Sequence, residues 1–379
     1  MNRRKFIYNS GILISGFYLY KLLRKKQLNT HCSNSSKRLI IIHLDGGHDG
    51  LFSIAPINND VINSNRKSLM MEISNGIKLN DELIINKHLV EFVDMLDKEW
   101  LNIMPNVGYP NPNTSHMISS NIWQTGNLPE EGNMNTGWFS DYAQHNIGNF
   151  QKDNLKPFGI SFESGRQSIF QGEKNYYAIQ NPEHDFLNIH YSKLDKMIEN
   201  EDWEKDKFLF NEFNNHLQFS KILEDIPLSN NYPNSDLGRK LSKTINIIKN
   251  QNKLNIYHIK HHGYDTHLGQ ADRLKRLYSD LGKSIKKIAQ DLHFINEWKN
   301  TQILIYSEFG RSIDENRNGG TDHGTAGPVF ILGGENIFDK QFNIKPIYET
   351  YNIGNDKYLK YQVDFRKIFL NIRDNWILS

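Results

Sequence analysis

The sequence predicts an α/β fold, with a doubly wound, mostly parallel sheet sandwiched by helices, on three observations. Short apolar runs such as RLIIIHLD (38–45) and TQILIYS (301–307) have the composition of strands buried on both faces. Helical segments separate several of these runs, and strands that alternate with helices favour a parallel sheet. Of the 379 residues, 38% are hydrophobic and 12% aromatic, which is enough for a large core.

The first 36 residues are expected to be a signal or membrane anchor. Arg3 and Arg4 precede a mostly apolar run at 11–20, which is too short to span a bilayer as a helix. The pattern resembles a twin-arginine export signal without an A-x-A cleavage site. The alternative is an interfacial anchor held by basic residues at 21 and 24–26. Both interpretations predict a periplasmic or cell-envelope protein with membrane contact through its N-terminus.

The composition argues against nucleic-acid binding and against structures that depend on several cysteines. The formal net charge is only +2, and no basic cluster follows residue 26, which argues against nucleic-acid binding. Cys32 is the single cysteine, so an intrachain disulfide framework and a cysteine-based zinc cluster are excluded. A metal site in this chain must therefore use histidines and carboxylates.

Further elements are predicted along the rest of the chain, which we expect to form one domain over 37–379. Strands like the first are expected near PFGISF (157–162), LNIYHIK (254–260) and PVFILGG (328–334). The clearest helix follows His267, and its apolar residues recur every three or four positions: Leu274, Leu277, Leu281, Ile285, Ile288, Leu292 and Ile295. A short helix is expected from His116 to Gln124. The Asn-, Lys- and Glu-rich segment 181–252 is expected to be a helical insertion.

Acids and histidines recur where the predicted strands end. Those that follow strands are Asp45, Asp49, Asp265, His267 and Glu308. Because parallel strands end at the same edge of a sheet, where ligands bind in open α/β folds, these side chains should converge. Asp322 and His323 precede the last strand, and the long loop 311–327, with its four glycines, should let them reach the same edge.

This convergence predicts a divalent cation. Crowded carboxylates repel one another and raise their own pKa values unless a cation neutralises them. Mixed carboxylate and imidazole ligands suit zinc, manganese or iron, whereas an oxygen shell suits calcium or magnesium. The structural alternative is that Glu308 pairs with Arg311, Asp322 caps the loop and His323 bonds to backbone. Burying several unpaired carboxylates is costly, which favours a functional site.

The stretch NTSHMISSNIWQTG (113–126) supplies candidate catalytic groups. Ser115 stands just before the predicted helix, where it either caps the helix or faces the metal edge. In the second case, the helix N-terminus and the cation would lower its pKa and prepare a nucleophile for phosphorus or sulfur esters. His116 is expected to orient the substrate. The remaining histidines near these strands are expected to be core or supporting groups: His43, His258, His261 and His262. The alternative for His261 or His262 is a further metal ligand.

The ordered motifs resemble a bacterial family exported by the twin-arginine route, called domain of unknown function 1501. They are GGHDGLFSIAP (46–56), NTSHMISSNIWQTG (113–126), TGWFSDY (136–142), YDTHLGQADRLKRLYSDL (264–281), SEFGRSIDENRNGGTDHGTAGPVFILGG (307–334) and VDFRKIF (363–369). The resemblance covers 39–376 except for the middle insertion. That family is similar in fold to the alkaline phosphatase and sulfatase superfamily, whose members hydrolyse phosphate or sulfate esters with metals at strand ends. The resemblance therefore implies a metal-dependent ester hydrolase.

The resemblance also assigns roles to the first half of the candidate residues. Asp45 or Asp49 resembles the metal-binding acid that follows the first strand, and Ser115 occupies the place of the hydroxyl nucleophile. Asp265 and His267 resemble an Asp-His pair on one metal, although their spacing is shorter than in the phosphatases.

The later motifs indicate that one of the metal sites of the superfamily lacks a histidine ligand in this chain. Glu308 matches the acid of a second Asp-His pair, but Phe309 stands where the imidazole is expected. His323 resembles the final metal-binding histidine, with Asp322 beside it. Arg311 is expected to pair with a tetrahedral anion.

Three functions remain open from the sequence. The first is a hydrolase of phosphate or sulfate esters that uses zinc, manganese, iron or calcium. The second is a degenerate, non-catalytic protein that binds a sulfated or phosphorylated glycan or a partner protein. The third is a structural surface protein, in which the metal serves stability alone, so that chelation lowers the melting temperature without affecting a ligand.

Overall fold

The computed structural model describes residues 37–131, 134–139, 159–163, 167–171, 176–178, 228–250, 256–334, 347–354 and 356–377. All of them belong to one compact unit, Ser36–Ser379. The expected signal or anchor at 1–36 lies outside the described residues, and of the expected insertion at 181–252 only 228–250 are described. Within the described part of the chain, no helix has both the length and the apolar character needed to cross a membrane.

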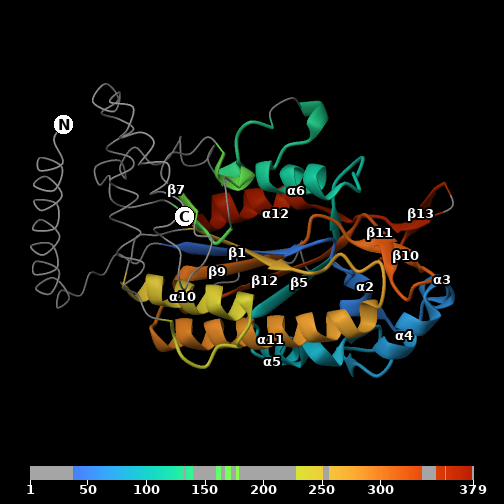
Figure 1. Ribbon diagram of the computed structural model, residues 1–379, viewed down its shortest axis with the longest axis horizontal. Helices are drawn as coiled ribbons and strands as arrows, with labels where there is room; N and C mark the ends of the chain where they lie inside the picture. The colour runs from blue at the N-terminus through green and yellow to red at the C-terminus, as the bar shows by residue number, and fades with distance from the viewer. Residues whose placement is uncertain are drawn as a thin grey trace, which may run out of the picture. The chain divides into compact units, whose positions relative to one another are not determined.

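A sheet forms the centre of the described residues (Figure 1). It has eight strands, in the order β15-β5-β12-β9-β1-β8-β6-β7. Its strands are β1 (Arg38–Asp45), β5 (Leu101–Gly108), β6 (Gly159–Ser161), β7 (Tyr176–Ala178), β8 (Ile256–His262), β9 (Thr301–Tyr306), β12 (Gly327–Gly333) and β15 (Val363–Asp364). Strand β1 pairs in parallel with β8 and β9, and β6 pairs in parallel with β7 and β8. The predicted α/β class with a mostly parallel sheet is confirmed.

Strand β12 differs from the expectation, because it runs antiparallel to both neighbours, β5 and β9. A parallel neighbour needs a crossover connection, usually a helix, and no helix lies between β9 and β12. The chain instead folds back through the antiparallel pair β10 (Arg311–Glu315) and β11 (Thr321–His323). Strand β12 therefore begins at the edge where the parallel strands end, and this direction brings His323 to that edge.

Two hydrophobic cores cover the two faces of the sheet, as the alternation along β1 requires. Ile40, Ile42 and Leu44 pack into one core, and Leu39 and Ile41 pack into the other. Helices α5 (Val90–Asp97), α10 (Asp236–Asn250) and α11 (Gln270–Phe294) cover the first face, while α6 (His116–Thr125) and α12 (Phe365–Ile372) cover the second (Figure 1).

The two predicted helices are present with nearly the expected bounds. Along α11, the expected apolar stripe faces the core, and Ile295 forms the C-cap. Helix α6 ends at Gly126, whose left-handed φ of 73° is the usual conformation after a helix C-terminus. Helix α10, at the end of the expected insertion, contributes Leu237 and Leu241 to the core rather than lying at the periphery.

Smaller elements complete the described residues. The short helices are α2 (Gly50–Ser53), α3 (Asp60–Asn65) and α4 (Lys67–Ile73), with 3₁₀ turns η1 (Lys87–Leu89), η2 (Pro129–Glu131), η4 (Ser168–Phe170) and η6 (Trp298–Asn300). The remaining strands are β2 (Ile54–Pro56), β3 (Ile77–Lys78), β4 (Leu83–Ile85), β13 (Thr350–Ile353) and β14 (Asp356–Leu359). A π-helical turn, η8 (Arg373–Ile377), follows α12.

Candidate metal centre

The loop after β1 is shaped by two glycines that sequence reasoning did not single out. Gly46 and Gly47 have φ values of 121° and 77°, a region that other residues rarely occupy. A Cβ atom on Gly46 would lie 2.3 Å from the backbone nitrogen of Asp265. The close approach places the backbone after β1 against the loop after β8, and it turns two carbonyl groups toward Arg311.

Arg311 holds these loops together from a buried position. Its Nε donates to the carbonyl oxygen of Gly47 at 2.7 Å, and its terminal nitrogens donate to three further carbonyls, those of Gly46, Tyr264 and Thr321. A fourth acceptor for these nitrogens is the Asp265 carboxylate, 2.6 Å from Nη2. Nη1 also lies 3.5 Å from Nε2 of His267. Most donors of Arg311 thus bond to the protein itself, and its role as an anion ligand stays a prediction.

Asp265 sits at the centre of the candidate site. Burial alone would raise its pKa, but the hydrogen bond and the charge of Arg311 outweigh that effect and lower the pKa. The carboxyl group therefore stays ionised at neutral pH. Its side chain remains about half exposed, so one side of the carboxylate faces open space.

Three imidazole rings surround Asp265, and each has its Nδ1 fixed by an acceptor. His116, the first residue of α6, bonds from Nδ1 to Oε1 of Glu308 at 2.8 Å. His267 bonds from Nδ1 to the carboxylate of Asp322 at 2.9 Å, and His323 donates from Nδ1 to the carbonyl oxygen of Thr114 at 2.8 Å. An acceptor at Nδ1 places the proton there and leaves a lone pair on Nε2 of the neutral ring.

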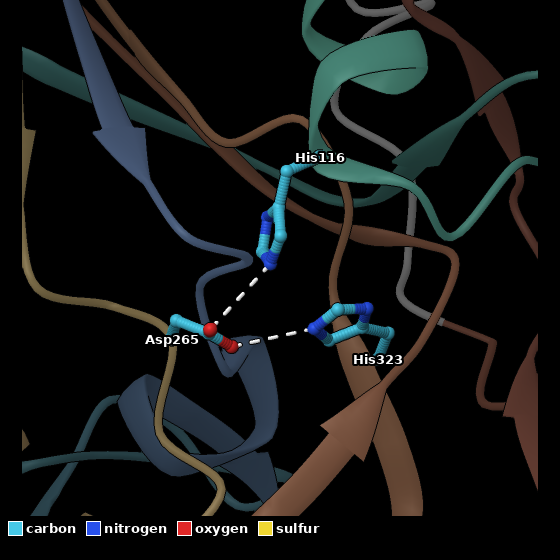
Figure 2. A group of neighbouring side chains, drawn as sticks. All are labelled: His116, Asp265 and His323. Carbon is cyan, nitrogen blue, oxygen red and sulfur yellow. Dashed lines mark hydrogen bonds and ion pairs between the residues drawn. The ribbon is translucent and has the colours of Figure 1, made fainter.

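The three Nε2 atoms converge on Asp265. Nε2 of His323 lies 3.0 Å from Nε2 of His267 and 3.3 Å from Oδ1 of Asp265. Nε2 of His267 lies 3.0 Å from the same oxygen, and Nε2 of His116 lies 3.6 Å from Oδ2. Figure 2 shows His116 and His323 pointing toward Asp265 from two different elements, α6 and β11. The ligand atoms of His116, Asp265 and His323 all lie within 4.8 Å of one another.

This donor set fits a divalent metal ion such as zinc. At zinc–nitrogen distances of about 2.0–2.1 Å, the ligands of a tetrahedral site lie roughly 3.3 Å apart, close to the separations seen here. Nε2 of His267 and Nε2 of His323 lie 3.0 Å apart, so their lone pairs repel unless a proton or a metal ion lies between them. Nε2 of His116 is a buried atom without a hydrogen-bond partner. Histidine and carboxylate ligands with Nδ1 held by acceptors are typical of such sites.

The surroundings of His323 and His116 shift the pKa values of the two rings in opposite directions. Burial lowers the pKa of His323, with the charge of Arg311 adding to the effect, so its neutral, metal-binding form is favoured. The hydrogen bond to Glu308 raises the pKa of His116. A metal ion that binds His116 near neutral pH would therefore displace a proton.

Glu308 lies beneath the imidazoles and supports one of them. Its side chain is fully buried, and it bonds to His116, to Nε2 of His43 at 2.9 Å and to the backbone N–H of Gly46 at 2.9 Å. Burial would raise the pKa of Glu308, but the bonds from His116 and His43 hold it well below its usual range. The predicted metal ligand is thus bonded to protein donors at both carboxylate oxygens.

The other predicted metal acids are engaged elsewhere. Both carboxylate oxygens of Asp49 bond to Arg66 Nη1, and the amide of Gln270 also binds this buried group. Asp45 bonds to Lys260 at 2.9 Å and to Nδ1 of His262 at 3.0 Å. Neither acid contacts the three imidazoles, because strong ion pairs hold both at other points of the strand edge.

Phe309 and Ser115 both lie next to His116, one buried and one exposed. The ring of Phe309 is buried and packs against His116 and His323, with centroid separations of 4.9 Å for each pair. Ser115 occupies the N-cap position of α6, yet its side chain makes no capping hydrogen bond. The capping alternative is therefore not realised, and Ser115 lies exposed next to Thr114, whose carbonyl group binds His323.

The chain is similar to several solved structures at low sequence identity. The C-terminal periplasmic domain of EcEptC from Escherichia coli, in complex with Zn, has 8% identity and a TM-score of 0.42, with 83% of this chain and 77% of that chain covered. The soluble domain of lipooligosaccharide phosphoethanolamine transferase A from Neisseria meningitidis has 10% identity and a TM-score of 0.36, with 80% and 78% covered. Alkaline phosphatase from the Antarctic bacterium TAB5 has 12% identity and a TM-score of 0.31, with 79% and 92% covered.

No curated protein sequence matches the chain. Residues 249–335, which include Asp265, His267, Glu308, Arg311 and His323, match the model of the family described as Protein of unknown function (DUF1501), so the family indicated by the motifs is confirmed over that segment.

Proposed function

We propose that this protein is an exported metal-dependent hydrolase of phosphate or sulfate esters. One observation carries the proposal: three imidazoles, each oriented by an acceptor at Nδ1, present Nε2 within 3.6 Å of the Asp265 carboxylate. Of these, the ligand atoms of His116 and His323 lie within 4.8 Å of each other and of Asp265, beside the N-terminus of α6. His116, His267, His323 and Asp265 would hold the metal ion. When bound, such an ion stabilises negative charge on an ester oxygen and lowers the pKa of a nearby hydroxyl group.

The chain's own groups supply the remaining chemistry. Ser115 is the proposed nucleophile, since its exposed hydroxyl stands at the N-terminus of α6, where helix N–H groups favour negative charge. Its Oγ would attack phosphorus or sulfur, the ester P–O or S–O bond would break, and the departing alcohol would carry away the serine proton. Attack of water would then release the phosphate or sulfate and return a proton to Ser115. Phe309 forms an apolar wall beside two of the imidazoles. Arg311 keeps Asp265 ionised rather than binding the substrate.

The experiment that tests the proposal compares Ser115→Ala with Ser120→Ala, a matched change in the same helix. The full-length chain is assayed with p-nitrophenyl phosphate and p-nitrophenyl sulfate in the presence of zinc or manganese. We expect Ser115→Ala to lose at least about 100-fold in turnover with its metal content unchanged, and Ser120→Ala to keep wild-type activity. Equal activity of the two variants would exclude Ser115 as the nucleophile.

The second candidate is a non-catalytic protein that binds a sulfated or phosphorylated glycan. The burial of Phe309 against His116 and His323 favours it, because an apolar ring stands where the motif resemblance predicts a further metal-binding imidazole. In this case the wild-type chain would bind metal and a sulfated polysaccharide such as heparin, and it would turn over neither ester. Loss of heparin binding on chelation would then locate the ligand at the metal centre.

A further inference from the structure

The buried histidine of β1, His43, has no role in the proposed chemistry so far. Its side chain is fully buried on the same face of the sheet as Leu39 and Ile41, and its ring stacks on Tyr306 with centroids 4.9 Å apart. Its Nδ1 is buried without a hydrogen-bond partner. Its Nε2 has a partner, Oε2 of Glu308, at 2.9 Å. An imidazole therefore stands where the strand pattern calls for an apolar side chain.

The contacts of Glu308 show what this imidazole does. One carboxylate oxygen, Oε1, accepts from Nδ1 of His116 and from the N–H of Gly46. The other, Oε2, lies 2.9 Å from Nε2 of His43 and 3.0 Å from Oγ of Ser307. The Ser307 hydroxyl is 2.6 Å from the carbonyl oxygen of Leu44, which competes for its single proton. His43 is thus the donor on which Oε2 depends.

We propose that His43 is a positioning residue for the metal centre, because it fixes the carboxylate of Glu308, which in turn fixes the ring of His116 with Nε2 toward Asp265. This inference rests on the proposed metal site and adds a residue that lies behind it. His43 itself contacts neither Asp265 nor the other two imidazoles in the described residues. Its effect on the metal passes through two hydrogen bonds of 2.9 and 2.8 Å.

A purely structural role for His43 fits the surroundings less well. Burying a polar ring atom without a partner costs free energy, and an aliphatic residue at this position would avoid that cost while packing against Tyr306. The gain that offsets the cost is the charge-assisted bond to Glu308. Without that bond, Oε2 would lose its dependable donor, and the carboxylate would be free to turn away from His116.

The test uses two variants of His43 and one matched control in the full-length chain. His43→Leu removes the donor but keeps an apolar group against Tyr306, and His43→Gln keeps an amide N–H that reaches Glu308. His258→Leu is the control, because His258 is also fully buried, lies on the neighbouring strand β8 and makes no contact with Glu308. Zinc affinity is measured by competition with a chelator, and the geometry is followed by the absorption spectrum of bound cobalt.

We expect His43→Leu to weaken zinc binding about 10-fold, the lower end of the range for residues that orient a ligand, and to shift the cobalt spectrum. His43→Gln should stay within about threefold of wild type, since it restores the donor. The control should leave both metal readouts unchanged, even where its unfolding midpoint falls. A histidine with a merely structural role would not give this combination, in which His43→Gln keeps zinc affinity and His258→Leu leaves zinc affinity and the cobalt spectrum unchanged.

Two results would overturn the inference while leaving the metal site intact: wild-type zinc affinity in His43→Leu, or an equal loss of affinity in His258→Leu. If His43→Leu does not fold, His43→Asn replaces it, because its amide is one methylene shorter and does not reach Glu308. The asparagine variant should then bind zinc more weakly than the glutamine variant, and equal affinities would refute the role. A wild-type chain that binds neither zinc nor cobalt would instead contradict the proposed function.

Discussion

Replacing Arg311 with lysine should unfold the site rather than weaken substrate binding. The guanidinium donates to four backbone carbonyls, on the loops after β1 and β8 and on β11, and to the Asp265 carboxylate. A lysine ammonium has three donors at a single point and cannot reach all of these acceptors. At least two buried acceptors would remain bare, at about 1–3 kcal/mol each, so we expect a loss of roughly 2–6 kcal/mol in the free energy of unfolding.

Urea unfolding of the metal-free chain measures this loss directly. Arg276→Lys is the matched control, because Arg276 is exposed on α11, and surface changes of this kind usually fall within about 0.5 kcal/mol. If Arg311→Lys kept wild-type stability and raised KM for an anionic ester, the guanidinium would be a substrate ligand. The assignment drawn from its contacts would then be wrong, and the role indicated by the sequence motif would be right.

Three further outcomes follow from individual contacts. Asp49→Asn should lower the free energy of unfolding by about 3–5 kcal/mol, because it breaks the buried ion pair with Arg66. The zinc affinity of the folded variant should stay unchanged, and a large loss of affinity would make Asp49 a metal ligand. Hydrogen bonds to Asp45 and Glu163 raise the pKa of His262 to about 9. The free energy of unfolding lost in His262→Gln should therefore be largest below about pH 6.5 and vanish above about pH 9. A difference in stability between wild type and variant that grew with pH would contradict this. Asp322→Asn should weaken zinc binding by about 10–100-fold through His267, and no change in a chelator competition would show that the carboxylate does not orient that ring.

Strand positions and helix periods could be predicted from the sequence because they depend on local composition. The apolar run at β1 and the stripe along α11 both lie where the pattern placed them. The direction of β12 could not be predicted in this way, since its apolar run suits a buried strand of either direction. The absence of a helix between β9 and β12 is the signal that argues for an antiparallel return.

The candidate site was only partly predictable for a related reason. Asp265, His267 and His323 converge because strand ends share an edge, as expected. Asp49 carries the same sequence signal, yet Arg66, seventeen positions away, binds it, and no local pattern predicts that pairing.

Supporting residues were harder to find than ligands. His43 was expected to be a core or supporting group, but its partner Glu308 lies 265 positions further along the chain. Its one visible signal is a polar ring within the otherwise apolar stretch Leu39–Leu44 of the strand. The glycine pair after β1 carried a similar signal, because two consecutive glycines after a buried strand favour a turn of unusual backbone conformation.

The central claim is that His116, His267, His323 and Asp265 bind a metal ion, and counting the ions bound per chain tests it most directly. The purified full-length chain is supplied with zinc, manganese, iron and calcium, dialysed and measured by elemental analysis beside Asp265→Ala and His323→Ala. We expect one ion per wild-type chain, because Glu308 and Asp45 are already bonded to protein donors, and none in either variant. A wild-type chain without metal, or variants that retain it in full, would contradict the claim.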